Sequence, residues 1–184
     1  SVWAKSYDSD FIDEMQYELH LSVANEFILA GGKGPVLDVG AGTGVLAKAL
    51  LQRGKFSIEA TDISEAMLEV AKSKNIYDRC FWSDLTKQIP VANSSYNGVV
   101  SSGTFTHGHV GPSSMFELVR ISKPGGVIVI SVNEAHWNAL DFKTEVRKIS
   151  EVVKSYKLKK ISIYGKQSTH DHKDDKALIL TIKV

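Results

Sequence analysis

The segment VLDVGAGTG, residues 36–44, constrains the fold of this chain more than any other. Its first half is almost continuously apolar, which is typical of a strand buried on both faces of a parallel sheet. Glycines follow at positions 40, 42 and 44, and glycine allows the backbone to turn tightly and to approach a bound molecule closely. The segment therefore predicts a buried parallel strand that leads into a turn facing a ligand.

The rest of the chain alternates apolar clusters with helical patterns, which predicts a doubly wound α/β sheet with right-handed crossovers. The last two predicted strands are joined only by 165–176, which is too short for a helical crossover, so we expect them to form an antiparallel hairpin. The expected strands are 36–40, 56–63, 79–84, 97–102, 126–133, 159–164 and 177–184, and the expected helices are 11–30, 43–53, 64–74, 113–122 and 143–155.

Composition narrows the possible partners and the compartment. The chain has 184 residues, 43% of them hydrophobic, which suits one domain with a full-sized core. A net charge of +1 gives no electrostatic case for nucleic acid or an anionic membrane. The single cysteine, Cys80, favours a reducing compartment. With no signal-peptide pattern and no long apolar run, we expect a cytoplasmic monomer or weak dimer.

A carboxylate in the second strand points to a nucleoside ligand. Asp62 ends that strand, 22 residues after Gly40, where an acid can accept hydrogen bonds from both hydroxyls of a ribose. The dinucleotide fingerprint G-x-G-x-x-G would need glycine at position 45, which is Val45. The sequence instead has D-x-G-x-G-x-G from Asp38 to Gly44. A nicotinamide-dependent dehydrogenase is therefore the less favoured alternative.

These motifs resemble the class I S-adenosylmethionine-dependent methyltransferases. Residues 38–44 are similar to motif I of that family, ATDIS (60–64) to motif II, SDL (83–85) to motif III and YNGVVSSGTF (96–105) to motif IV. A narrower resemblance is to the Williams–Beuren critical-region methyltransferase-like subfamily. It rests on the segments SSGTFTHGHVGPSSMFELVRISKPGG and DFKTEV. The resemblance implies a Rossmann-like, seven-stranded, mostly parallel sheet with an antiparallel C-terminal strand. It also implies one domain, with 1–33 as lid and helix and 34–184 as the core.

The resemblance further implies S-adenosyl-L-methionine as the cofactor and assigns roles in holding it. Asp38 would hold its ammonium group, Asp62 its ribose and Asp84 its adenine amino group. The residues alone leave other readings open, since Asp38 could bond only to nearby loop amides and Asp84 could cap the next segment. The implied cofactor-binding set is Tyr7 in the lid, Asp38, Gly40, Ala41, Gly42, Thr43, Gly44, Asp62, Ile63 and Leu85 around the adenine, Asp84, and Ser102.

The acceptor side carries weaker signals. His107 and His109 follow the predicted strand 97–102, and a histidine near neutral pKa suits proton removal from a hydroxyl or amine. The alternative is a pair of exposed loop histidines. Trp137 could wall an acceptor pocket or cover the core. THDHKDD (169–175) could suggest a metal site, but we expect a solvated hairpin loop and no metal.

These observations predict a methyltransferase acting on an unidentified acceptor. A small molecule is the first expectation and a protein side chain the second. Motif IV has Asn97 where aspartate is commoner, and it lacks the proline–proline–aromatic run associated with amino-group methylation of bases and glutamine. A non-catalytic S-adenosylmethionine-binding module or partner subunit is the alternative.

Overall fold

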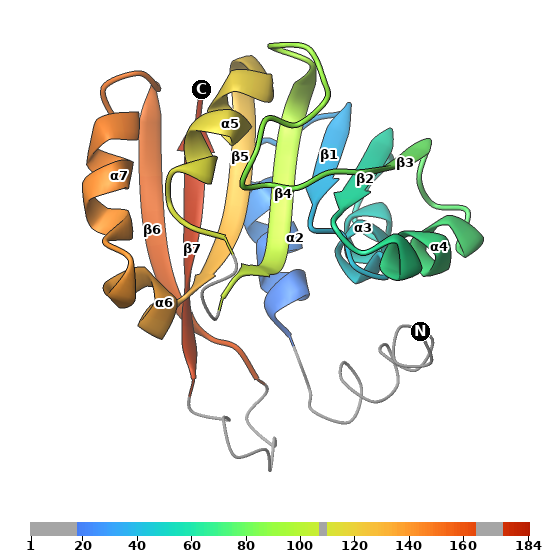
Figure 1. The fold of residues 1–184 in the computed structure, drawn as a ribbon, viewed down its shortest axis with the longest axis horizontal. Coiled ribbons are helices and arrows are strands. Elements are labelled where there is room, and N and C mark those ends of the chain that lie inside the picture. Colours follow the sequence, from blue (N-terminus) through green and yellow to red (C-terminus); the bar gives the residue numbers. More distant parts are fainter. Residues whose placement is uncertain (1–17, 107–109, 165–174) are drawn as a thin grey trace.

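The computed structural model describes residues 18–106, 110–164 and 175–184. The described residues form a seven-stranded sheet in the order β3-β2-β1-β4-β5-β7-β6 (Figure 1). The pairs among β1 to β5 are parallel, whereas β7 runs antiparallel to both of its neighbours. The Rossmann-like fold and the C-terminal hairpin are thereby confirmed. The strands are β1 Val36–Val39, β2 Ile58–Asp62, β3 Arg79–Trp82, β4 Tyr96–Phe105, β5 Ser122–Asn133, β6 Ser155–Ser162 and β7 Lys176–Lys183.

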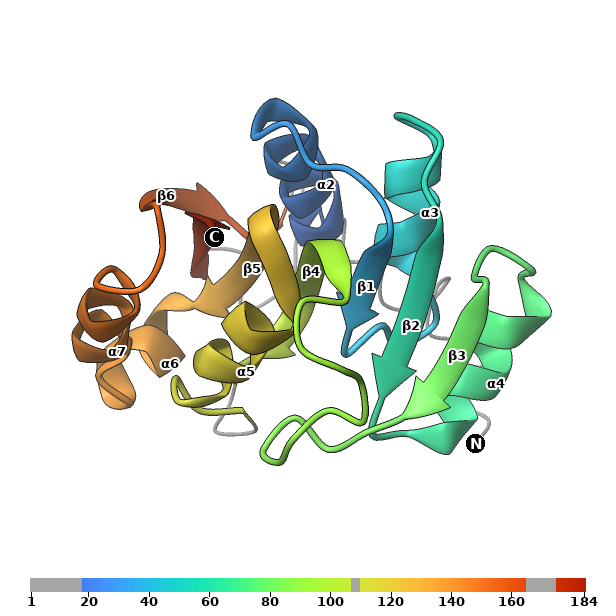
Figure 2. The same cartoon turned by 90° about the horizontal axis from the view of Figure 1, so that it is seen from above.

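Helices cover both faces of the sheet, as expected for a doubly wound fold (Figure 2). One face carries α2 (Leu19–Leu29), α3 (Val45–Leu51) and α4 (Glu65–Ser73). The other carries α5 (Ser114–Ile121), α6 (Glu134–Ala139) and α7 (Phe142–Ile149). Within the described residues, no helix has the length and apolar character needed to cross a membrane.

The continuous apolar run of β1 is explained by two cores, one on each side of the sheet. Leu37 and Val39 pack into the core beneath α5 and α7. Val36 packs into the core beneath α2 and α3, together with Phe27. All four residues of β1 are buried, so the strand cannot use the alternating pattern of a half-exposed strand. This double burial also encloses the only carboxylate of the strand, Asp38.

Several element boundaries differ from the sequence predictions; β5 and β6, for example, each begin four residues earlier than predicted. The predicted helix 143–155 is wrong beyond Ile149, because residues from Ser155 onward pair with β7 instead. The short helix α6 was not predicted; its N-terminus is capped by Asn133, whose side chain accepts from the His136 amide. Strand β4 continues to Phe105 with a register shift. The predicted helix 11–30 is described in part, as α2. This helix ends shortly before Gly31, whose backbone has a left-handed conformation.

Candidate functional site

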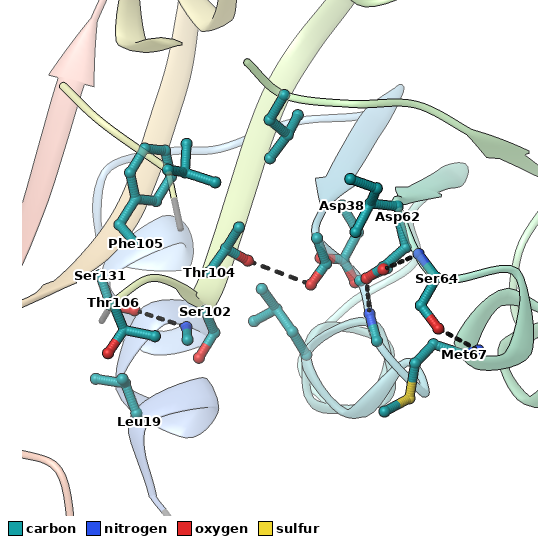
Figure 3. Close-up of a pocket in the computed structure, with 18 of the residues that line it drawn as sticks. Leu19, Asp38, Asp62, Ser64, Met67, Ser102, Thr104, Phe105, Thr106 and Ser131 are labelled. Carbon is teal, nitrogen blue, oxygen red and sulfur yellow. Dashed lines mark hydrogen bonds between the residues drawn. The ribbon is translucent and has the colours of Figure 1, made fainter. Parts of the chain in front are cut away.

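A pocket of about 620 Å³ opens at the carboxyl ends of the parallel strands (Figure 3). This is the edge where open α/β sheets bind ligands. Ten residues of the predicted cofactor set line it: Asp38, Gly40, Ala41, Gly42, Thr43, Asp62, Ile63, Asp84, Leu85 and Ser102. Gly44 does not line it, and Tyr7, His107 and His109 lie outside the described residues.

The three glycines of the loop are required for different reasons, although all have positive φ. A Cβ on Gly40 would lie 2.1 Å from the Thr104 hydroxyl, and one on Gly44 would lie 3.0 Å from the Tyr77 ring. A Cβ on Gly42 would meet nothing within 4 Å. Gly40 and Gly44 therefore allow close packing inside the protein, whereas Gly42 leaves open space on the pocket side.

Asp62 ties the glycine loop to the start of α4. One carboxylate oxygen accepts from the Gly42 amide at 2.8 Å and the other accepts from the Ser64 amide at 2.8 Å (Figure 3). Ser64 in turn caps α4 by accepting from the Met67 amide. A carboxylate has about four acceptor positions. Asp62 therefore retains capacity to accept from a ligand while it holds the loop.

Asp38 is the most buried acid of the pocket, with 1% of its surface exposed. Its Oδ2 accepts a hydrogen bond from the Tyr77 hydroxyl at 2.7 Å. The pKa of Asp38 is raised to about 7, mainly by burial. The hydrogen bond from Tyr77 lowers this pKa, the nearby charge of Asp62 raises it, and the hydrogen bond from the Ala47 amide lowers it. Asp38 therefore exchanges a proton near neutral pH.

Tyr77 was missed by the sequence reasoning. It lies in the connection between α4 and β3, in the polar stretch SKNIYDR, and it is 39 residues from Asp38. Burial and the neighbouring Asp38 charge raise the pKa of Tyr77 well above its usual value. A lone tyrosine in a polar connection is the only signal that could have indicated it.

Asp84 lies at the pocket edge beyond β3. Its Oδ1 accepts from the Thr86 hydroxyl at 2.7 Å and from the Thr86 amide at 2.9 Å, and these bonds lower the pKa of Asp84. The alternative capping interpretation of Asp84 thus describes its contacts, although the residue also lines the pocket. Ile63 is 62% exposed at the rim and Leu85 is buried, so both present apolar surface near this acid.

The far side of the pocket is built by β4 and β5. The Ser102 hydroxyl is buried there without a hydrogen-bond partner among the described residues. Next to it, the Gly103 amide donates to the Ser131 hydroxyl at 3.1 Å (Figure 3). A buried polar atom without a partner is costly. Ser102 thus brings to the pocket wall a hydroxyl that has no hydrogen-bond partner among the described residues.

Two motif residues lie away from the pocket. Trp137 stacks on Phe142 with ring centres 5.4 Å apart and belongs to the core. It does not line the pocket, so the interpretation as a pocket wall is wrong, because α6 turns its ring toward α7. Asn97 lies at the opposite end of β4, where its side chain donates to the Gly34 carbonyl at 2.7 Å.

His136, in α6, has a structural contact near the acceptor side. Its Nε2 lies 2.8 Å from the carbonyl oxygen of Val110, which lines the pocket. The histidine is 5% exposed. It therefore fixes the residue that directly follows the segment 107–109.

Across residues 18–106, 110–164 and 175–184, no group of three or more histidine, cysteine or acidic residues is arranged to hold a metal ion. Most of the segment 169–175 lies outside those ranges.

The strand order and the pocket define a Rossmann-like methyltransferase fold. The putative methyltransferase solved in complex with the Trm112 methyltransferase activator of Haloferax volcanii superposes with a TM-score of 0.72 at 16% identity, over 99% of this chain and 96% of that one. The family model for the methyltransferase domain matches residues 36–126. Residues 36–126 thus match the methyltransferase-domain family, which supports the resemblance of this chain to the class I S-adenosylmethionine-dependent methyltransferases.

Two curated relatives agree with this assignment. Human methyltransferase-like protein 27 is 28% identical over 135 residues, covering 70% of this chain and 54% of that protein. The malonyl-[acyl-carrier protein] O-methyltransferase of Buchnera aphidicola subsp. Baizongia pistaciae is 31% identical over 115 residues, covering 62% of this chain and 45% of that protein. The chain thus spans about half the length of these relatives. The human match is consistent with the narrower subfamily resemblance.

Proposed function

We propose that this chain binds S-adenosylmethionine in the pocket and transfers its methyl group to an acceptor, which is a small molecule. The observation that carries the proposal is the arrangement of Asp62, which bonds to the amides of both Gly42 and Ser64 at the pocket edge. These two hydrogen bonds fix the Asp62 carboxylate beside the backbone of Gly42, which has open space around it. An acid in that position suits a ribose.

The other pocket residues fit the remaining parts of this cofactor. Asp38 offers a buried carboxylate to the ammonium group. Ser102 offers a hydroxyl without a partner in the described structure. Ile63 and Leu85 offer apolar surface to the adenine, and Asp84 an acceptor for its amino group.

When bound, the cofactor supplies a methyl group on a sulfonium sulfur, which is already a good leaving group. The task of the chain is therefore to align the acceptor with the methyl–sulfur bond and to exclude water. His107 and His109 are the proposed bases for a hydroxyl acceptor. The His136 contact with Val110 supports this, because it fixes the chain beside that segment. An acceptor that is a carboxylate or a neutral amine needs no base.

The choice of a small acceptor rests on the near-neutral charge of the chain and on its relatives. The similar Buchnera protein is named as an O-methyltransferase of malonyl-[acyl-carrier protein]. The alternative is a non-catalytic S-adenosylmethionine-binding module or partner subunit, since the pocket residues concern the cofactor and not the acceptor.

Calorimetric titration with S-adenosylmethionine and S-adenosylhomocysteine tests the cofactor, and we expect one site per chain. Binding of a nicotinamide dinucleotide, with neither adenosyl ligand bound, would contradict the proposal.

Isotopically labelled cofactor offered to metabolite pools and read by mass spectrometry tests the transfer. The His109→Ala variant should lower turnover without changing cofactor affinity, the pattern of lost help to the transition state alone. A cofactor-loaded chain that labels nothing, but captures a defined partner, would favour the partner-subunit alternative.

A further inference from the structure

The Asp38–Tyr77 pair joins three parts of the chain directly behind the glycine loop. Asp38 comes from β1, and the Tyr77 hydroxyl donates to it from the connection between α4 and β3. The Tyr77 ring also approaches Gly44, where an added Cβ would lie 3.0 Å away. Tyr77 therefore contacts both the loop and the acid, although it does not line the pocket itself.

The described groups that act most on Asp38 include no positive charge. Within the described residues, the groups that act most on its carboxyl are the Tyr77 hydroxyl, the Asp62 carboxylate of β2 and the Ala47 amide of α3. Cys80 of β3 also interacts electrostatically with Asp38. None of these is a cation. The hydroxyl of Tyr77 is the only side chain among them that favours the ionised form, because it donates to the carboxylate.

We propose that Tyr77 is a positioning residue for the cofactor. Its side-chain hydroxyl holds Asp38 in the ionised form that a cationic ligand needs. Cofactor binding and Asp38 ionisation are then coupled. The inference rests on the proposed function, since the ammonium group of S-adenosylmethionine is the cation that Asp38 would receive. A neutral Asp38 attracts this group far less than a carboxylate does.

The coupling has a definite sign. Asp38 has a pKa of about 7 in the free protein, so below that pH the cofactor must displace a proton before it can pair with the carboxylate. Near pH 6, binding should release about one proton per cofactor, because a bound cation lowers the pKa of an adjacent acid. Above pH 8, the carboxylate is already ionised and this release should vanish.

The Tyr77→Phe variant tests the role of the hydroxyl while keeping the ring. Losing the hydrogen bond raises the Asp38 pKa by about one unit, which corresponds to about tenfold weaker cofactor binding near pH 6.5. The variant and the wild type should converge toward pH 9, where both carboxylates are ionised. The cofactor's own amino group titrates in this range, at about pH 7.7–8.0 for an ordinary α-amino group. It does so equally with both proteins, so the ratio of their dissociation constants isolates Asp38.

Tyr96→Phe is the matched control. Tyr96 also donates to a carboxylate at 2.7 Å, that of Glu59, but neither residue lines the pocket. The ratio of the cofactor dissociation constants of Tyr96→Phe and the wild type should remain near one at every pH.

Calorimetry in two buffers of different ionisation enthalpy measures proton release by the wild type. This measurement keeps the test valid if Tyr77→Phe does not fold.

The outcomes separate the two proposals. A wild type that binds no S-adenosylmethionine overturns the proposed function and this inference with it. Binding with no proton release near pH 6 overturns the inference alone. So does a Tyr77→Phe affinity that is reduced equally at every pH, because a residue that only supports the fold would act in that way.

Discussion

Two tyrosine–carboxylate pairs lie on opposite faces of this sheet, and their surroundings differ. Glu59, which is paired with Leu37 in the register of β1 and β2, accepts from Tyr96 at 2.7 Å and also from the guanidinium of Arg79 at 2.7 Å. One register position further along, Asp38 accepts from Tyr77 at 2.7 Å, and the groups that act most on it include no cation. Asp38 is also far more buried than Glu59, whose side chain is 26% exposed.

The comparison contrasts a carboxylate that is paired with a cation inside the protein with one that we propose pairs with a ligand. The Glu59–Tyr96 pair has Arg79 as its positive partner. Among the described residues, the groups that act most on the buried Asp38 include no cation, and burying an unpaired charge costs free energy. A pocket opens directly beside that acid. A cationic ligand would supply to Asp38 what Arg79 supplies to Glu59.

The largest effect is expected for Asp38→Asn. The folded-state pKa of Asp38 is raised from 3.8 to about 7, so the folded state binds the proton more tightly. The contribution of Asp38 to the free energy of unfolding is therefore greatest below pH 4 and falls as the pH rises through 7. Relative to the Asn variant, the wild type should lose on the order of 4 kcal/mol between pH 4 and pH 8. Urea unfolding without cofactor measures this, and a pH-independent difference would contradict it.

Asp62→Ala should act on the ligand instead of on the fold. Loss of the ribose acceptor and of the Gly42 and Ser64 contacts should weaken cofactor binding by about 1–3 kcal/mol. Because Asp62 ends a strand beside the pocket, the variant should still fold. Asp78→Ala is the control, since Asp78 accepts from Ser57 away from the pocket. Unchanged affinity in folded Asp62→Ala would remove this acid from the site.

Glu59→Gln, on the opposite face of the sheet from Asp38, should affect the fold and not the ligand. It weakens a partly exposed contact with Arg79, so the free energy of unfolding should fall by about 1 kcal/mol or less. Cofactor affinity should be unchanged. Thermal unfolding and calorimetry on the same sample check both quantities. A loss of affinity equal to that of Asp62→Ala would mean that the two faces of the sheet are not independent.

An effect of similar size, but on binding, is expected for Ser102→Ala. Its hydroxyl has no partner among the described residues, so removal should leave the stability of the free protein nearly unchanged and weaken cofactor binding by about 1 kcal/mol. The neighbouring Ser101 hydroxyl donates to the Val39 carbonyl at 2.7 Å in the core. Ser101→Ala should therefore reduce stability by about 1 kcal/mol. Equal stability losses in both variants would show that Ser102 is already satisfied.

Local patterns in the sequence determined the order of strands and helices, because burial on both faces and helical periodicity are visible within short windows. They also identified the glycine loop and Asp62, since both belong to one strand–turn–helix unit and the strand that follows it. The cap at Ser64 was predictable for the same reason. The end of α7 was not, because the pairing of residues from Ser155 with β7 outweighed the helical pattern.

Only the tertiary structure decided which residues surround the acids. The strand order places β4 beside β1, and this brings Thr104 against Gly40 across 64 residues. The turn from α4 into β3 brings Tyr77 onto Asp38 across 39 residues. Trp137 lies in the core because α6 packs it on Phe142. Such contacts depend on how distant segments meet in space, and no short window of sequence records that. The sequence thus determined that an acid lies within the buried first strand, and the tertiary structure decided that a tyrosine would hold it.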